Sequence, residues 1–275
     1  MSKEKQYQID GNSEDAHIIH LKHQVKVQYD EKYDYYLKSP IKKFFSKIFM
    51  FFGVGIFKLI HFFHFNLKVK NKKILKNLRK QKTAFITIAN HCLIFDSTMS
   101  VATTFPKTTY LPTVEPTMKM PFVRFILRAG NIMPIPLNLK GLVKFKNDCN
   151  EVLKNGKVLH YFPEGALWPY YGKLREFKSG AFRFAVDANA PILPYCFYFR
   201  ERKGIWKLLG KKPLVTLEIL QPLYPNTNLA KKDAIQELLE RSHAAMKEVL
   251  DLHPYDNPQY NEIESKLHED TNTTF

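Results

Sequence analysis

The chain has few cysteines and none of the motifs that usually hold a metal or a nucleotide. Its 275 residues include three cysteines, Cys92, Cys149 and Cys196, without paired spacing. A small, odd count is typical of proteins from a reducing compartment. No Cys/His cluster has zinc spacing, and no glycine-rich P-loop or dinucleotide fingerprint occurs. We therefore expect neither a bound metal nor a resident cofactor.

Acidic residues are missing from a long stretch of a basic chain. The formal net charge is +16, and no Asp or Glu occurs between Ile41 and Phe95. That stretch holds the basic residues Lys42, Lys43, Lys47, Lys58, Lys68, Lys70, Lys72, Lys73, Lys76, Arg79, Lys80 and Lys82. Such a charge balance favours an anionic partner, either a membrane surface or a nucleic acid. Because the sequence has no nucleic-acid-binding motif, we expect membrane lipid and no nucleic acid as partner.

The apolar run inside this basic stretch is too short to cross a membrane by itself. Residues 48–57 (IFMFFGVGIF) are uninterrupted, and Lys58, His61 and His64 then break the pattern. A spanning helix needs about 20 apolar residues. Phenylalanines flanked by lysines are typical of a helix that lies in the membrane interface. We predict membrane association at the cytoplasmic face, interfacial rather than spanning; a buried amphipathic helix is the alternative. The segment starts too late for a cleaved signal peptide.

Beyond this segment, apolar runs and helical patterns alternate. Strands are predicted at residues 83–89, 109–111, 132–135, 157–162, 192–199 and 214–220, and residues 25–37 could be a strand or an extended lead-in. Helices are predicted at residues 72–80, 97–104, 121–129, 140–154, 179–189 and 229–250. The alternation predicts an α/β fold, a mostly parallel central sheet flanked by helices, with an N-terminal membrane-associating helix or helix pair. The expected organisation is a polar leader (1–38), the membrane-associating segment (39–70), the α/β domain (71–252) and a polar tail (253–275).

A histidine and a carboxylate follow the first predicted strand of this domain. His91 and Asp96 lie in the segment Asn90-His91-Cys92-Leu93-Ile94-Phe95-Asp96, after the apolar run 84–89. Side chains at the carboxyl end of a strand point into the usual ligand crevice of an α/β fold. If the chain turns after His91, Asp96 can hold one ring nitrogen protonated and leave the other as a base. Alone, the pattern also fits a helix-start Asp beside a structural His.

A second polar corner follows the predicted strand at residues 157–162. Phe162-Pro163-Glu164-Gly165 reads as a turn in which Gly165 can take positive φ. It would aim Glu164 and several backbone amides over the sheet. An ordinary turn with a solvated Glu is the alternative.

Together these segments resemble the glycerophospholipid acyltransferase family, the lysophosphatidic acid acyltransferases and their relatives. The family has an Asn-His-X4-Asp box, a Gly-rich block ending in Ile/Pro-x-x-Arg, a Phe-Pro-Glu-Gly block and a Pro-Ile-x-Pro block. The first, third and fourth match at residues 90–96, 162–165 and 191–194. The second matches in part at residues 130–136. The resemblance covers roughly residues 85–195.

The resemblance implies transfer of a fatty acyl group from acyl-CoA or acyl-carrier protein to a lysophospholipid hydroxyl, turning lysophosphatidic acid into phosphatidic acid. His91 would be the base and Asp96 would orient it, with Asn90 or the amides after it as oxyanion donors. The expected substrate-binding residues are Asn90, Gly130, Phe162, Pro163, Glu164, Gly165, Arg175 and Lys178.

Two departures bear on the acceptor. The Arg that ends the family's second block falls here on Pro136 or Leu137, and the Thr-Arg after Glu-Gly is replaced by Ala166-Leu167. Both arginines are suited to clamping a phosphate bidentately. Nearby cations that could replace them are Lys140, Lys144, Lys173, Arg175 and Lys178. Trp168, Tyr170 and Tyr171 suggest either a more apolar or sugar-like acceptor or a loop packed on the body.

Three other functions fit parts of the sequence. An acyltransferase could use a glycolipid or another lysolipid as acceptor. A hydrolase could use the His-Asp pair on water or serine, but Ser97 and Ser100 lie in no G-x-S-x-G elbow. A thiol nucleophile at Cys92 has no other support. The lysine-rich stretch at residues 68–82 also fits a non-enzymatic basic membrane-surface protein.

Overall fold

The computed structural model describes residues 29–114 and 123–261. Their core is a seven-stranded sheet in the order β1-β7-β6-β2-β5-β3-β4. The strands are β1 Lys68–Lys70, β2 Phe85–Ala89, β3 Thr109–Val114, β4 Ile132–Ile135, β5 Val158–Tyr161, β6 Ile192–Arg200 and β7 Leu214–Ile219. β6, β2, β5, β3 and β4 run parallel, whereas β7 pairs antiparallel with β6 and parallel with β1. The expected α/β fold with a mostly parallel sheet is confirmed.

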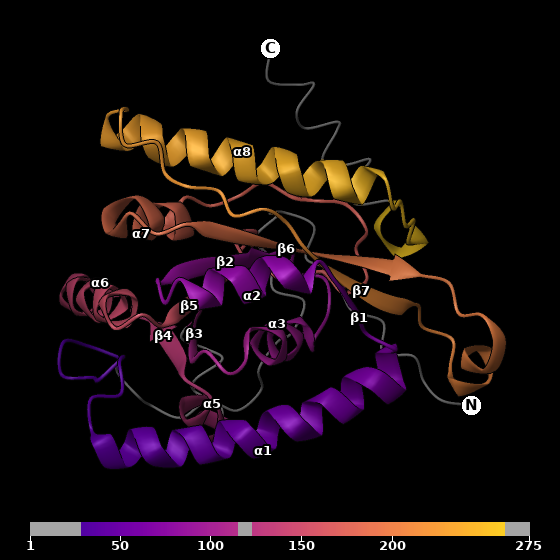
Figure 1. Cartoon of the computed structure of the whole chain (residues 1–275), viewed down its shortest axis with the longest axis horizontal. Coiled ribbons are helices and arrows are strands. Elements are labelled where there is room, and N and C mark those ends of the chain that lie inside the picture. The colour runs from indigo at the N-terminus through magenta and orange to yellow at the C-terminus, as the bar shows by residue number, and fades with distance from the viewer. Residues whose placement is uncertain (1–28, 115–122, 262–275) are drawn as a thin grey trace.

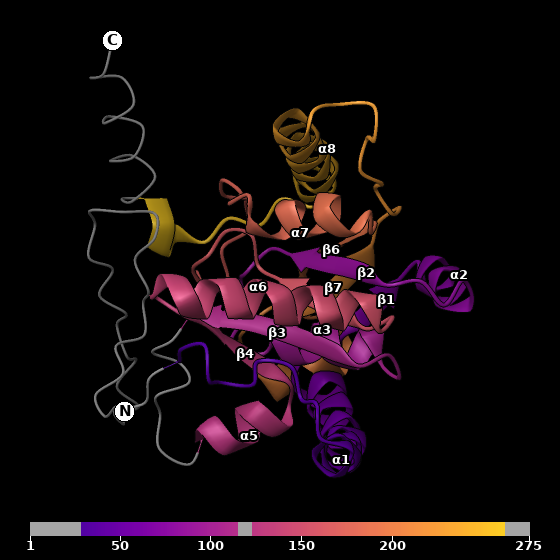
Figure 2. The same ribbon diagram turned by 90° about the vertical axis from the view of Figure 1, so that its left-hand side faces the viewer.

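Helices cover both faces of this sheet (Figures 1 and 2). They are α1 Pro40–Phe65, α2 Lys72–Lys80, α3 Asp96–Thr104, α5 Val123–Ala129, α6 Leu139–Lys154, α7 Gly180–Ala188 and α8 Lys231–Asp251, with short 3-10 helices at Gly204–Leu209 and Pro258–Tyr260. Ile86 and Ile88 of β2 pack in the cluster formed with α6, α7 and α8. Phe85 and Ala89 pack in the cluster of α2 and α3 on the opposite face. The side chains of β2 point alternately to the two faces of the sheet because a strand has a two-residue period. Both faces are apolar because helices cover both.

Both boundaries of each predicted element lie within two residues of the observed ones, apart from β3, which extends three residues beyond its predicted end. Two strands differ from expectation. β1 was not predicted, because its sequence Lys-Val-Lys reads as part of a basic run. The possible strand at residues 25–37 is not formed in its described part, 29–37; residues 25–28 lie outside the described residues, as do 121 and 122 of the helix predicted at 121–129.

The apolar N-terminal segment is one helix, α1, rather than a pair. Ser39 caps it, with Oγ accepting the Lys42 amide, and Asn66 ends it in the left-handed conformation. By length and composition alone, α1 could cross a membrane. One side packs on the body along its whole length: Ser46 bonds to the Ala129 carbonyl oxygen and His61 to Thr98.

The opposite side of α1 exposes large apolar side chains to solvent. They are Ile41, Phe44, Phe45, Ile48, Phe49, Phe51, Phe52, Ile56, Leu59, Phe62 and Phe63. The helix lies along the outside of α3 and α5, at the far side of the molecule from α8 (Figure 1). An exposed apolar surface of this extent is typical of a membrane-contact or interaction site.

The ends of the expected leader and tail contribute to the folded body. Tyr35 is buried, and its backbone amide donates to Asp148 Oδ2 of α6 over 3.1 Å. Tyr260, from the 3-10 helix after α8, stacks on the buried Trp168 with 5.4 Å between ring centroids. In the structure, therefore, the α/β body begins before residue 38 and extends past residue 253.

Candidate active site

The site begins where β2 and β5 end side by side. Ile88 of β2 lies opposite Tyr161 of β5, so the residues that follow them, His91 and Phe162, emerge at the same edge of the sheet. Their rings stack with 4.0 Å between centroids and 15° between planes. The two motifs, far apart in the sequence, are thus joined by the parallel pairing of two buried strands.

His91 and Asp96 form the expected pair. His91 Nδ1 lies 2.7 Å from Asp96 Oδ2; the Asp96 side chain is fully buried, whereas 21% of the His91 side chain is exposed. Asp96 is the first residue of α3, and its Oδ2 also accepts the Cys92 and Leu93 amides at 3.1 and 3.0 Å. A carboxylate held by backbone donors beside a ring nitrogen favours a proton on Nδ1. The other nitrogen, Nε2, is then the one able to accept a proton.

Glu164 connects the two motifs through the backbone of His91. Its Oε2 accepts the His91 amide at 3.2 Å and lies 2.6 Å from Arg175 Nη2. The Glu164 and Arg175 side chains are both buried. Arg175 Nη2 also donates to the Ala166 carbonyl oxygen, and its guanidinium lies 4.7 Å from the centre of the Trp168 ring. These contacts place Glu164 and Arg175 beneath the site as a support for its loops, which is not the direct substrate contact expected from the sequence.

Gly165 lies at the open side of the same turn. Its φ of +82° is the left-handed conformation that glycine adopts without strain, as the sequence predicted. A Cβ at this position would come within 3.0 Å of the Lys178 side chain, so Lys178 lies directly over Gly165. The Lys178 amide donates to the carbonyl oxygen of the buried Pro163 at 2.8 Å. Lys178 is exposed and is the cation among the expected site residues that lies nearest the surface.

The aromatic loop after Gly165 packs on the body. Trp168 is 1% exposed, and its amide donates to the His91 carbonyl oxygen at 3.0 Å. The Tyr170 amide donates to the Cys92 carbonyl oxygen at 2.7 Å. The loop therefore holds the backbone of His91 and Cys92, which favours packing over a sugar-binding role for these aromatics.

Two expected substrate-binding residues, Asn90 and Gly130, do not face the candidate site. Asn90 is 1% exposed; its Oδ1 accepts the Phe197 amide at 2.8 Å and its Nδ2 donates to the Phe197 carbonyl oxygen at 2.9 Å. Its amide is thereby engaged at both ends by β6. Gly130 precedes β4, which is separated from β2 by β5 and β3, and it lies at the opposite end of the strands from His91. The structure does not bring it to the site.

The amides after Asn90 are also engaged. Those of Cys92 and Leu93 donate to Asp96, and that of His91 donates to Glu164. All three amides thus hold the carboxylates that contact the His91 ring or support its loop. The expectation that they stabilise an oxyanion is therefore not supported.

Of the remaining candidate cations, Lys140 and Lys144 belong to α6 and Lys173 lies on the loop that follows Gly165. Lys144 pairs with Asp148 at 2.5 Å. Lys140 and Lys173 are exposed. Leu137, where the family has an Arg, follows the end of β4 and is 82% exposed. Of the candidate cations, Lys178 is the one whose side chain packs against the Phe-Pro-Glu-Gly turn through Gly165.

Nucleophile and metal chemistry find no support among the described residues. Cys92 is buried, and burial, then the nearby Asp96 and Glu164 carboxylates, raise the pKa of its thiol well above the usual range. A thiol held neutral is a poor nucleophile. The described residues include no group of three or more His, Cys, Asp or Glu side chains that could hold a metal ion.

Sequence reasoning missed His160 of β5, which lies next to the stacked pair. Its ring meets the Phe162 ring edge-on at 4.7 Å, and its Nδ1 bonds to Thr87 Oγ1 over 2.8 Å. Burial, and secondarily the charge of His91, lower its pKa to about 3. A neutral imidazole thus supports Phe162 from below. A lone His inside an apolar strand gave no signal for this role.

The family model described as Acyltransferase matches residues 66–198. Over this span the chain is similar to the acyltransferase family. That span contains the stacked His91 and Phe162, the His91–Asp96 pair and the Glu164–Arg175 support.

Among solved structures, the 1-acyl-sn-glycerophosphate (LPA) acyltransferase PlsC from Thermotoga maritima is similar, with a TM-score of 0.54 and 22% sequence identity. The match covers 80% of this chain and 86% of that one. At this identity the likeness concerns the fold. The comparison with curated proteins found no match.

Proposed function

We propose that this acyltransferase moves a fatty acyl group from a thioester donor to a lysophospholipid hydroxyl, with lysophosphatidic acid as acceptor and phosphatidic acid as product. The observation that carries the proposal is the His91–Asp96 pair, in which a buried carboxylate holds Nδ1 of a partly exposed ring. The family match and the likeness to the T. maritima protein, which is named as an acyltransferase for 1-acyl-sn-glycerophosphate, support this choice of reaction.

In the proposed reaction, His91 Nε2 takes the proton of the acceptor hydroxyl as that oxygen attacks the thioester carbonyl carbon. The carbon–sulfur bond breaks as the tetrahedral intermediate collapses, and the thiolate leaving group recovers the proton. Asp96 stabilises the imidazolium that forms between these steps. Phe162, stacked on the ring, restricts its rotation and keeps one face of it from water. Because the thioester is already activated, no acyl-enzyme is needed.

We assign the acceptor phosphate to Lys178. Its side chain lies over Gly165, at the open edge of the site, and the residue immediately precedes the turn into α7. A lysine binds phosphate as a point charge rather than bidentately. The donor is acyl-CoA or acyl-carrier protein, both acidic and so suited to a basic protein.

We also propose that α1 holds the protein at the cytoplasmic face of a membrane, lying in the interface. One side of the helix packs on α3 and α5 along its length, while the other exposes its phenylalanines. A helix covered on one side by its own domain would have to leave that domain to be surrounded by lipid. Interfacial insertion retains both sets of contacts.

The deciding experiment is release of free thiol from an acyl thioester across a panel of lysolipid acceptors. The proposal expects turnover with lysophosphatidic acid, loss of turnover in His91→Ala, and little turnover with a phosphate-free lysolipid. Turnover of a glycolipid or another lysolipid alone would retain acyl transfer and replace the acceptor. A covalent acyl-enzyme trapped with hydroxylamine would instead support a hydrolase-like nucleophile. Absence of turnover with every acceptor would favour a non-enzymatic membrane-surface protein.

A further inference from the structure

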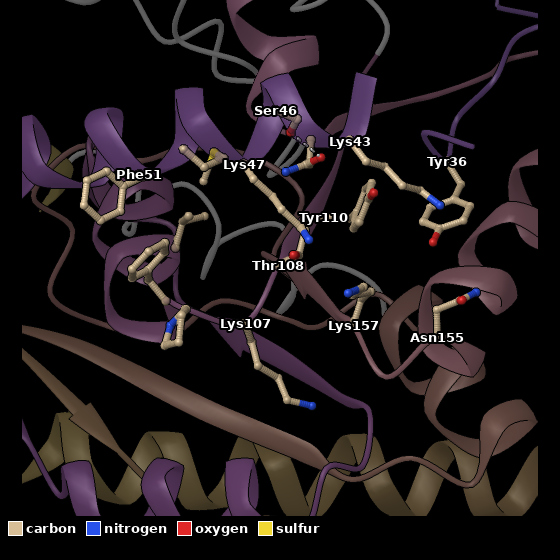
Figure 3. A pocket seen from close by; sticks show the side chains of 15 residues that line it. Tyr36, Lys43, Ser46, Lys47, Phe51, Lys107, Thr108, Tyr110, Asn155 and Lys157 are labelled. Atoms are coloured by element: carbon tan, nitrogen blue, oxygen red, sulfur yellow. Dashed lines mark hydrogen bonds between the residues drawn. The ribbon is translucent and has the colours of Figure 1, made fainter. Parts of the chain in front are cut away.

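A pocket of about 440 Å³ lies between α1 and the sheet, away from the catalytic pair (Figure 3). Thr108 and Lys157, which line it, precede β3 and β5. β2 runs parallel to both strands, and His91 follows its C-terminal end. The pocket thus lies at the N-terminal ends of the parallel strands and the candidate active site at their C-terminal ends. His91 and Asp96 are not among the residues that line the pocket.

Lysines gather at the polar end of this pocket. Lys43 and Lys47 project from α1 into the pocket, and Lys157 lies across it, just before β5 (Figure 3). Burial, and then the charges of Lys47 and Lys43, lower the pKa of Lys157. No acidic side chain occurs among the lining residues in the described part of the chain. The mutual repulsion of these ammonium groups is therefore not offset by a carboxylate of the pocket, and an anion would relieve it.

A buried amide provides a second, independent indication of an anion. Asn131 lines the pocket and is 1% exposed. Its Oδ1 accepts the Ser46 hydroxyl at 3.2 Å, and its Nδ2 has no hydrogen-bond partner among the described residues. A buried donor without a partner is costly, and a phosphate oxygen at the lysines would satisfy it.

One part of the pocket wall is apolar and includes side chains of α1. Met50, Phe51, Val101, Phe105 and Pro106 form this part. Phe51 is also among the exposed aromatics of α1, so the pocket wall and the proposed membrane face share a residue. The lining is therefore suited to an amphiphile with an anionic head and an apolar body, rather than to a soluble ion or nucleotide.

We propose that this pocket binds the phosphate head group of an anionic phospholipid, taken from the membrane on which α1 lies. Lys43, Lys47 and Lys157 neutralise the phosphate, Asn131 donates to it, and the first carbons of the acyl chains follow the apolar wall. This second lipid site fixes the orientation of the helix on the bilayer. It does not depend on acyl transfer, so it applies equally to His91→Ala protein.

The test is a calorimetric titration of the full-length protein in detergent with dihexanoyl phosphatidic acid. Lys47→Gln and Lys157→Gln should each weaken binding roughly tenfold or more, because each removes a charge-assisted contact. Lys42→Gln is the matched control, since Lys42 is an exposed lysine of the same helix that does not line the pocket, and it should leave affinity unchanged. Dihexanoylglycerol, which lacks the phosphate, should not bind.

Three results would overturn the proposal. Unchanged affinity in the Lys47→Gln/Lys157→Gln double variant would show that the lysines do not hold the lipid. Binding lost in Lys178→Ala and kept in the double variant would place the lipid at the candidate active site. Inorganic phosphate binding as tightly as the lipid would show that the apolar wall contributes nothing and that the ligand is a soluble anion.

Discussion

Glu164 lies between Arg175 and the backbone of His91, with its Oε2 2.6 Å from Arg175 Nη2 and 3.2 Å from the His91 amide nitrogen. One carboxylate oxygen thus ties the loop after β5 to the loop that carries the candidate base. The pair is buried, so its charges are desolvated and each depends on the other. Within the Phe-Pro-Glu-Gly motif, Glu164 therefore acts on His91 through the backbone, whereas Phe162 stacks on its ring.

We predict that Arg175→Met destabilises the protein and reduces acyl transfer through His91 rather than through the acceptor. Removing one partner of a buried pair costs about 3–5 kcal/mol, because the other charge stays buried and unpaired. The free energy of unfolding in urea should fall accordingly, and acceptor KM should change little. Arg183→Met, at an exposed position of α7, is the control and should leave stability nearly unchanged. A large rise in acceptor KM at full stability would instead mean that Arg175 contacts the acceptor.

We expect His91→Ala to reduce acyl transfer to less than about a tenth of the wild-type rate, since general base catalysis contributes roughly 10²–10⁴-fold. Asp96→Asn should cost nearly as much, because Asn cannot stabilise the imidazolium. Thiol release from the donor thioester measures both. Circular dichroism and vesicle binding should be unaltered in His91→Ala; a rate above that tenth would contradict the role of His91 as base.

The sheet and the contact between His91 and Asp96 could be predicted from the sequence because both depend on local patterns. Buried parallel strands are continuous apolar runs, so residues 132–135 could be delimited without a structure. His91 and Asp96 are joined by one turn, and five residues of spacing sufficed to predict their contact.

Roles that depend on distant partners could not be predicted. Asn90 belongs to the motif, but the backbone that engages its amide lies at Phe197, 107 residues away. Tyr35 falls in the predicted polar leader because nothing near it in the sequence indicates that its amide donates a hydrogen bond to Asp148 of α6. β1 was missed because Val69 is the one apolar residue of a three-residue strand.

The membrane contact of α1 can be tested without deleting the helix, whose inner side packs on the body. Phe44→Ser and Phe52→Ser replace outward side chains that are 61% and 63% exposed. Each removes apolar area that the interface would bury, worth about 1.5–3 kcal/mol for a complete side chain. Co-sedimentation with anionic vesicles should fall markedly in the double variant.

Salt distinguishes insertion from surface attraction. High salt should weaken binding of the wild-type protein but not abolish it, because screening does not act on the apolar contribution. Complete release by salt alone, or unchanged binding of the double variant, would contradict insertion of α1.

The acceptor phosphate provides a further test. Lys178→Ala should raise acceptor KM roughly tenfold or more and change donor KM little, since charge-assisted contacts are worth about 1.5–3 kcal/mol. Lys173→Ala, another exposed lysine on the segment that follows Gly165, is the control. Unchanged acceptor KM together with equal turnover of a phosphate-free lysolipid would reject lysophosphatidic acid as acceptor and leave acyl transfer in place.

Finally, His160 makes stability depend on pH in a direction that can be derived. Burial lowers its pKa to about 3 in the folded chain, against the usual 6.5. Below about pH 6.5 the unfolded chain therefore binds a proton that the folded chain does not, and stability falls as the pH falls, by up to about 1.4 kcal/mol per pH unit for one proton.

His160→Asn should remove this contribution and flatten the stability curve in that range. Thr87→Val is the control: it removes the hydrogen bond to Nδ1 but keeps the titrating ring, so stability should drop at every pH while the slope stays. Urea unfolding on either side of about pH 6.5 measures both; an equally steep slope in His160→Asn would mean that the ring is protonated in the folded chain.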